Sequence, residues 1–182
     1  TFCDQAGTGA RRRSPPKVIE EIKQCVEKFG IKEISFWDDT MSYHRKWMKE
    51  FLNLLIEENL DLCWSCYAAV NTVDKEILKL MQKAGCWNIF YGYETAIDTL
   101  AKNILTNRKN RDFEKMKQVA QWTKEAGIEV RGSFLIGLPG ETPELARKTV
   151  QKSARQKMTH NTCSMPAKQC RNLSENMMLN MY

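Results

Sequence analysis

The segment AGCWNIFYGYE, residues 84–94, decides the fold of this chain. It completes an amphipathic helical stripe formed by Ile77, Leu78, Met81 and Ala84. Gly85 stands where a helix ends on a left-handed residue, and the apolar run after it is typical of a strand that is apolar on both faces. The segment therefore predicts a helix, a sharp stop, and a strand of a parallel sheet that begins near Trp87.

Three other segments share this plan of helix, stop and short apolar strand: EKFGIKEISFW (27–37), EENLDLCWSCY (57–67) and KEAGIEVRGSFLIG (124–137). The strands are expected to begin near Ile31, Asp61, Trp87 and Ile128, a spacing that leaves room for a helix between parallel strands. Such repeats predict an α/β fold, either a doubly wound sheet or a βα barrel. In both, ligands bind at the carboxyl ends of the strands.

The first helix is predicted from Ser14-Pro15-Pro16, a cap followed by prolines that suit a first turn. Its apolar stripe comprises Val18, Ile19, Ile22, Val26 and Phe29.

The composition is that of one globular domain of 182 residues, with 42% hydrophobic and 27% charged residues. No apolar run approaches the roughly 20 residues that span a bilayer, and no signal-peptide pattern is present, so no membrane association is expected. The net charge of +6 comes without an aromatic-interleaved or helix-turn-helix pattern, which argues against nucleic-acid binding. Seven irregularly spaced cysteines indicate a reducing, cytoplasmic compartment.

The predicted strand ends carry acids and glycines: Trp37-Asp38-Asp39, Ala69-Val70-Asn71-Thr72, Gly92-Tyr93-Glu94 and Gly137 to Thr142. Three of the four ends are acidic, which favours a cationic or hydroxyl-rich ligand that the backbone approaches closely. Alternatively, Asp38-Asp39 could cap a helix start together with Thr40 and Ser42. Cys63-x-x-Cys66 could be a redox or zinc half-site. Residues three apart on a strand point to opposite faces, however, so core packing is favoured.

With these motifs in order, the chain resembles the radical S-adenosylmethionine (SAM) enzymes, most closely the subgroup with an N-terminal cobalamin-binding domain. The signature of that superfamily is C-x-x-x-C-x-Φ-C, with Φ an aromatic residue, and Thr1-Phe2-Cys3 fits its last three positions. RRRSP, EISFWDD, AGCWNIFYGYE and EVRGSFLIGLPGET match the subgroup pattern over residues 1–150. The first two cysteines of the motif are then expected upstream of Thr1.

The resemblance implies a partial (β/α)6 TIM-like barrel and a [4Fe-4S] cluster whose open iron is chelated by SAM. Reductive cleavage of SAM would yield a 5′-deoxyadenosyl radical, used for cobalamin-dependent methyl transfer or related radical chemistry. Cobalamin would be held by a domain absent from this chain. The substrate, a small molecule or a peptide, is not identified, and the electron donor would be a ferredoxin or a flavodoxin.

The resemblance also implies residue roles. Cys3 is expected to ligate the cluster, and Asp38 and Asp39 to hold the ammonium group of SAM. Glu94 is expected at the ribose hydroxyls or the aminoacyl part, and Gly137 to Gly140 against the adenine, since glycine has no Cβ to block the approach. No catalytic side chain is assigned.

The sequence departs from the subgroup at two places. Ala69 and Asn71 stand where an arginine and an aspartate are usual. Residues 151–182 do not match and are predicted to be a poorly ordered tail after an N-terminally truncated core domain, residues 1–150. With one thiol of the cluster motif, the chain alone is expected to be inactive.

Two other functions stay open from the residues. The chain could be a non-catalytic βα fragment whose acidic strand ends bind a small molecule or a partner. It could also be a different βα-barrel enzyme with a phosphate site, which the acids and the lack of a glycine-rich helix start argue against.

Overall fold

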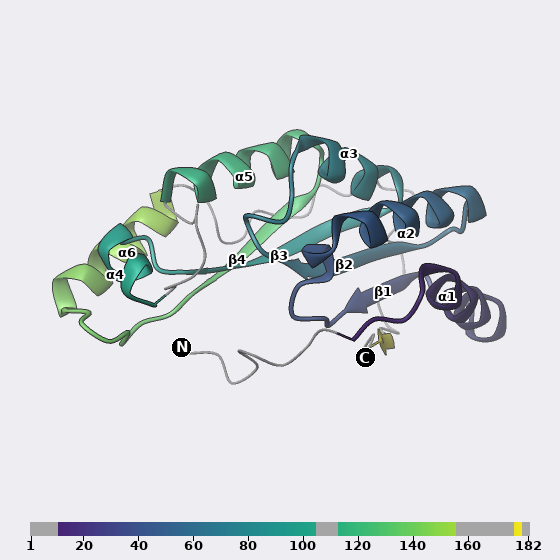
Figure 1. Cartoon of the computed structure of the whole chain (residues 1–182), viewed down its shortest axis with the longest axis horizontal. Helices are drawn as coiled ribbons and strands as arrows, with labels where there is room; N and C mark the ends of the chain where they lie inside the picture. Colours follow the sequence, from purple (N-terminus) through teal and green to yellow (C-terminus); the bar gives the residue numbers. More distant parts are fainter. Residues whose placement is uncertain (1–10, 105–112, 156–176, 180–182) are drawn as a thin grey trace.

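The computed structural model describes residues 11–104, 113–155 and 177–179. In chain order the elements are α1 (Pro15–Phe29), β1 (Glu33–Phe36), the 3₁₀ helix η1 (Met41–Tyr43), α2 (Arg45–Glu58), β2 (Cys63–Ala68), α3 (Lys75–Lys83), β3 (Cys86–Glu94), α4 (Asp98–Ile104), α5 (Phe113–Glu125), β4 (Glu129–Phe134), α6 (Pro143–Arg155) and β5 (Met177–Leu179) (Figure 1). Strands β1 to β4 begin within two residues of the predicted positions, so the α/β class is confirmed.

The strands form one sheet in the order β4-β3-β2-β1-β5, and every neighbouring pair is parallel. Because sequential strands β1 to β4 are also neighbours in space, each connection crosses over through the intervening helices. β4 lies at one edge of the described sheet. The pairing of β5 with the outer edge of β1 was not predicted.

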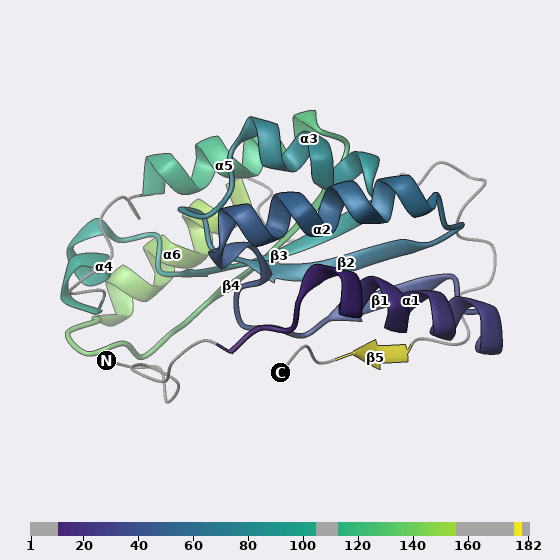
Figure 2. The ribbon, with the colours of Figure 1, turned by 45° about the vertical axis from the view of Figure 1, so that its right-hand side comes forward.

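Helices α2, α3 and α5 lie along one face of the sheet, and α1 lies beside β1 (Figures 1 and 2). The side chains of the covered face form the hydrophobic core. Ile34, Trp64 and Ile89 are fully buried there. Trp64 also donates its indole N–H to the carbonyl of Ala84, 2.7 Å away, so its one polar atom is satisfied inside the core.

The predicted stripe of α1 is confirmed at Val18, Ile19 and Ile22 but is wrong at Phe29, whose side chain is 64% exposed. Phe29 is the last residue of the helix, and Gly30 (φ 64°) turns the chain toward β1 directly after it. Ser14 occupies the N-cap position, but its side chain makes no capping hydrogen bond.

Gly85 explains why the segment at 84–94 can leave its helix so sharply. Its φ of +90° is unfavourable for other residues, and an added Cβ would lie 2.6 Å from the carbonyl oxygen of Leu62. Glycine is therefore needed here both for conformation and for the close approach of the chain leading into β2.

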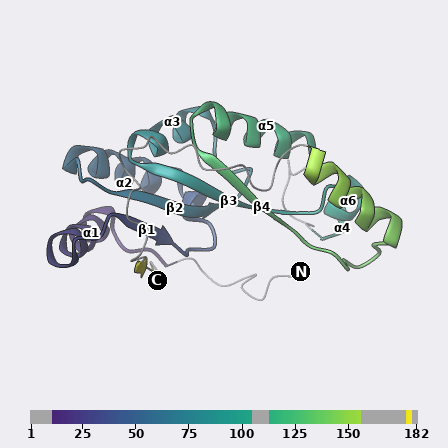
Figure 3. The same cartoon turned by 180° about the vertical axis from the view of Figure 1, so that it is seen from behind.

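The sequence pattern predicted strands that are apolar on both faces, but in β1 and β2 the second face is more polar than predicted. The face away from the helices carries half-buried Glu33, Ser35 and Ser65, and no described helix lies along it (Figure 3). The two serine hydroxyls are 2.6 Å apart and hydrogen-bonded across β1 and β2. One face of the sheet thus supplies the core, and the other stays open.

Helix α6 continues to Arg155, and the predicted tail is otherwise described only at β5; residues 156–176 and 180–182 lie outside the described residues. Within the described chain, no helix is both long and apolar enough to cross a membrane.

Candidate functional site

The carboxyl ends of β1 to β4 meet at one edge of the sheet, where the sequence places its acids and glycines. Asp38 and Asp39 follow β1, and Glu94 ends β3. One strand, β2, lies between them, so the two acidic groups come from strands roughly 10 Å apart. This edge is the candidate site.

Asp38 and Asp39 lie in the turn between β1 and η1, with Asp38 half-buried and Asp39 exposed. The N-cap of η1 is Thr40, and the N-cap of α2 is His44, whose Nδ1 accepts from the amide of Trp47 at 3.3 Å. The two aspartates therefore do not occupy the N-cap positions of η1 and α2, whereas Thr40, named in the same capping alternative, is the N-cap of η1.

A hydrogen bond between the hydroxyls of buried Ser42 and half-buried Thr72 holds the loop after β2 against this turn. The hydroxyls of Ser42 and Thr72 are 2.5 Å apart, and Thr72 also donates to the carbonyl of Ala69 at 2.7 Å. Ala69 is buried, whereas Asn71 is exposed. Where the subgroup has an arginine, this chain therefore presents a small buried side chain.

Glu94 has a backbone conformation that is rare for a residue with a side chain. Its φ is +65°, and the register of β3 against β4 shifts between Gly92 and Glu94. Such strain costs about 1–3 kcal/mol and concentrates at functional sites. The amide of Leu135 donates to the carbonyl of Glu94 at 2.7 Å, which holds this conformation.

The bulge brings the Glu94 carboxylate back over Gly92. A Cβ at residue 92 would lie 2.7 Å from Glu94 Oε1, so glycine at 92 leaves the space that the carboxylate fills. Tyr93, between them, points into the core, where burial raises the pKa of its hydroxyl. No described residue hydrogen-bonds that hydroxyl.

The turn at Gly137 to Gly140 is organised by Glu141, to which the sequence pattern assigned no role of its own. Glu141 Oε2 accepts from the amide of Gly137 at 2.5 Å and from that of Leu138 at 3.3 Å. Gly137 and Gly140 have φ of +89° and +81°, and an added Cβ at either would meet nothing within 4 Å. Glycine is needed here for conformation, and the predicted approach to adenine stays a prediction.

The cysteines divide into two groups. Cys3, the predicted cluster ligand, lies outside the described residues. Cys63, Cys66 and Cys86 are buried and not part of a disulfide, which confirms the core-packing interpretation of Cys63-x-x-Cys66. Burial raises the pKa of Cys86, and a hydrogen bond with Cys66 raises it further, so this thiol stays protonated. Within the described residues, no group of three or more metal-ligating side chains could hold an ion.

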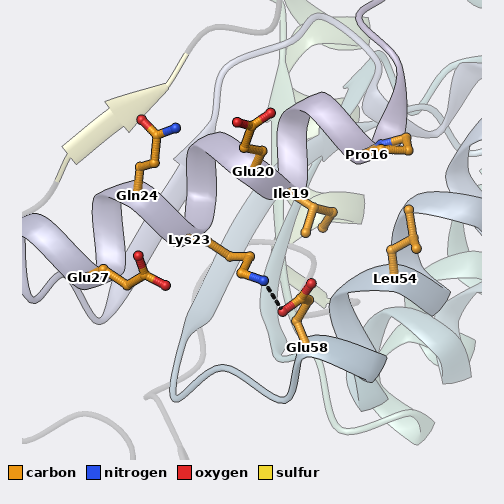
Figure 4. Close-up of a pocket in the computed structure, with 8 residues that line it drawn as sticks. All are labelled: Pro16, Ile19, Glu20, Lys23, Gln24, Glu27, Leu54 and Glu58. Carbon is orange, nitrogen blue, oxygen red and sulfur yellow. Dashed lines mark ion pairs between the residues drawn. The ribbon is translucent and has the colours of Figure 1, made fainter.

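A groove of about 300 Å³ lies between α1 and α2, away from the strand ends (Figure 4). Ile19 and Leu54 line it, together with the Lys23–Glu58 ion pair of 2.7 Å. The groove contains none of the predicted site residues.

Comparison with known protein families shows which family this chain belongs to. The model of the Radical SAM superfamily matches residues 1–152, a stretch that contains every predicted site residue. The chain belongs to the radical SAM superfamily.

Radical SAM relatives differ in what they do. An uncharacterized methyltransferase of Pyrococcus horikoshii is 32% identical over 82% of this chain and 33% of its own length. The anaerobic magnesium-protoporphyrin IX monomethyl ester cyclase of Rubrivivax gelatinosus is 30% identical over 82% of this chain and 27% of its own. The chain thus spans about a third or less of the length of these relatives.

Solved radical SAM structures show the same fold. The methyltransferase TsrM of Kitasatospora setae, solved with cobalamin and a [4Fe-4S] cluster bound, has a TM-score of 0.74 at 21% identity, covering 80% of this chain and 29% of TsrM. The cobalamin-dependent enzyme OxsB has a TM-score of 0.64 at 14% identity, over 84% of this chain and 23% of its own. The partial-barrel architecture predicted from the sequence is confirmed.

Proposed function

We propose that this chain forms the SAM-binding and cluster-binding core of a radical SAM enzyme that transfers a methyl group or carries out related radical chemistry with cobalamin. The superfamily match over residues 1–152 supports the cofactor pair. The methyltransferase among the relatives, and the neighbours with bound cobalamin, support the reaction class. The observation that carries the proposal is Glu94, which has a left-handed backbone at the end of β3 and lies at the same edge of the sheet as Asp38 and Asp39, with β2 between them.

The donors present fit SAM chemically. Carboxylates accept hydrogen bonds from ammonium and hydroxyl groups, so Asp38 and Asp39 would hold the amino group and Glu94 the ribose or aminoacyl part. The turn that Glu141 organises would offer main chain to the adenine at Gly137 and Gly140. Cys3 would be a cluster ligand. Bound SAM, with the cluster, supplies the carbon-centred radical.

The remaining partners follow from the same proposal. A reduced ferredoxin or flavodoxin would deliver the electron, and a cobalamin domain outside this chain would carry the methyl group. The substrate would bind on the open face of the sheet, because the helices cover the other face.

Two variants that must fail differently test the proposal, in a protein expressed with the residues encoded upstream of Thr1. After anaerobic reconstitution, Cys3→Ala should lack the cluster absorbance and all SAM cleavage. Glu94→Gln should keep the cluster and bind SAM more weakly. Cys25→Ala, which changes a buried cysteine on α1, is the matched control and should keep both. A Cys3→Ala protein with full iron content would refute the cluster assignment, and SAM binding without cleavage in the parent protein would favour the non-catalytic alternative.

A further inference from the structure

Helix α6 links two segments at the strand ends that are proposed to bind SAM. It begins at Pro143, shortly after the turn at Gly137 to Gly140 that Glu141 organises. Its second half contacts the loop that follows Glu94, beside α4 (Figures 1 and 2). The helix therefore connects the turn after β4 to the end of β3.

The face of α6 that packs on this loop is polar, although it is buried. Thr149 and Ser153 are buried there, whereas the apolar Val150 is 56% exposed. Thr149 Oγ1 lies 3.4 Å from Oγ1 of Thr95, which is also buried. Thr95 Oγ1 accepts from the amide of Ile97 at 3.2 Å, so this hydroxyl has a fixed place in the loop. Hydrogen bonds between buried polar groups fix one arrangement of the two elements, which an apolar contact does less strictly.

Lys152 makes a second contact between α6 and the loop. Its Nζ donates to the carbonyl of Ala96 at 3.1 Å and lies over the ring of Phe113 at 4.8 Å. Lys152 is half-buried and Ala96 is fully buried, so this hydrogen bond is partly shielded from water. An ammonium group forms stronger hydrogen bonds than a neutral donor. The carbonyl two residues after Glu94 is thus held by a charged group from another helix.

Glu94 needs such support because its left-handed backbone is strained. A conformation of this kind persists only where the surrounding structure holds it. One support is the amide of Leu135, which donates to the Glu94 carbonyl at 2.7 Å. The contacts of Thr149 and Lys152 with residues 95 and 96 are a second support. Because Leu135 also leads into the turn from which α6 starts, the two supports are joined through that helix.

We propose that Thr149 and Lys152 are positioning residues for SAM binding, which act through Glu94 and do not touch SAM. They hold the loop after β3 so that the Glu94 carboxylate stays at the edge of the sheet where SAM is proposed to bind. Helix α6 thereby couples this carboxylate to the turn at Gly137 to Gly140. This inference rests on the proposed function for the identity of the ligand, but one of its readouts needs neither the cluster nor SAM.

The first readout is hydrogen exchange of the Leu135 amide in the purified chain, measured by NMR. Lys152→Met keeps most of the apolar stem but removes the donor to Ala96. The Leu135 amide should then exchange about 2- to 12-fold faster, the change that one hydrogen bond of typical strength makes. Lys152→Arg, which keeps a donor, should restore slow exchange. Lys148→Met changes an exposed lysine of the same helix and is the matched control, with wild-type exchange expected.

The second readout is SAM affinity, measured by calorimetry on the cluster-loaded protein expressed with the residues encoded upstream of Thr1. Lys152→Met should weaken SAM binding about 2- to 12-fold and leave the cluster absorbance unchanged. In a double variant with Glu94→Gln, Lys152→Met should add little to the loss, because it acts through that carboxylate. A general loss of stability would instead weaken binding by the same factor with or without Glu94. If Lys152→Met does not fold by circular dichroism, Thr149→Val takes its place in both assays.

The inference is overturned by wild-type SAM affinity in Lys152→Met, by unchanged exchange of Leu135, or by a loss of affinity that adds fully to that of Glu94→Gln. Equal effects of Lys148→Met and Lys152→Met would overturn it as well. If the parent protein binds no SAM while Lys152→Met still speeds the exchange of Leu135, the proposed function is wrong and only the structural link from α6 to Glu94 stands.

Discussion

Replacing Gly92 by alanine tests whether the position of the Glu94 carboxylate, rather than its presence, governs SAM affinity. The new Cβ would lie 2.7 Å from Glu94 Oε1, too close for the carboxylate to stay. The atom displaced is the far end of a flexible side chain, so the fold should tolerate the change. Alanine also restricts the unfolded chain, which offsets part of any cost by about 0.4–1 kcal/mol. The free energy of unfolding should therefore change little.

The effect on SAM should be large by comparison. A hydrogen bond to a charged group contributes about 1.5–3 kcal/mol, so losing it should weaken SAM binding roughly 10- to 150-fold. Titration calorimetry on the cluster-loaded protein measures this for Gly92→Ala, Glu94→Gln and the double variant. Because both changes act through one carboxylate, the double variant should bind SAM almost as well as the single variant that binds SAM more weakly. Additive losses, or wild-type affinity in Gly92→Ala, would refute the reasoning.

Two further predictions concern stability. Asp74 caps α3 by accepting from the amide of Ile77 at 2.9 Å and also pairs with Arg45, so Asp74→Ala should lower the free energy of unfolding in urea by about 1 kcal/mol, and Asp74→Asn by less. Burial acts to raise the pKa of Asp74, but the hydrogen bonds from Ile77 and Arg45 outweigh it and lower the pKa. The contribution of the Asp74 carboxylate to the free energy of unfolding should therefore be present above about pH 4 and be lost as the pH falls below it. A pH-independent difference in stability between wild type and Asp74→Asn would contradict the assignment. Burial raises the pKa of Tyr91, so the free energy of unfolding should fall as the pH rises above about 10. It should fall less in Tyr91→Phe, which at neutral pH loses only the 2.9 Å hydrogen bond to Thr123. If urea titrations at pH 8 and 10.5 show the same change in stability for wild type and Tyr91→Phe, the prediction is wrong.

The sequence predicts the elements well because each strand start is marked locally. Gly30, Gly85 and Gly127 all have positive φ, and each follows a helix whose apolar period is visible in the sequence. These signals depend only on neighbours along the chain, so they can be recognised without knowledge of the tertiary structure. Phe29 fails for the same reason: its position on the helical stripe is right, but the turn that follows takes it out of the core.

Only part of the candidate site could be predicted from the sequence. The acids at 38, 39 and 94 are readable because strand ends can be located, and the parallel order then gathers them at one edge. The left-handed conformation of Glu94 depends on a register shift between strands, and the role of Glu141 depends on the geometry of a turn. Neither can be predicted from the local sequence pattern. The exposure of Trp37 and the half-burial of Tyr67 and Phe90 were not predicted, because these residues look like core residues in strands that are rich in aromatic residues.

The two faces of the sheet differ in how well they should tolerate substitutions. The helix-covered face holds fully buried side chains such as Trp64 and Ile89, where removing atoms leaves a cavity and costs several kcal/mol. The open face carries half-buried side chains such as Tyr67 and Phe90, whose replacement removes less buried apolar surface and should therefore cost less. Alternation along each strand places the two kinds of residue one position apart. The same nine-residue strand, β3, can therefore keep its stability through Ile89 and Tyr91 while a half-buried residue such as Phe90 is replaced at a lower cost.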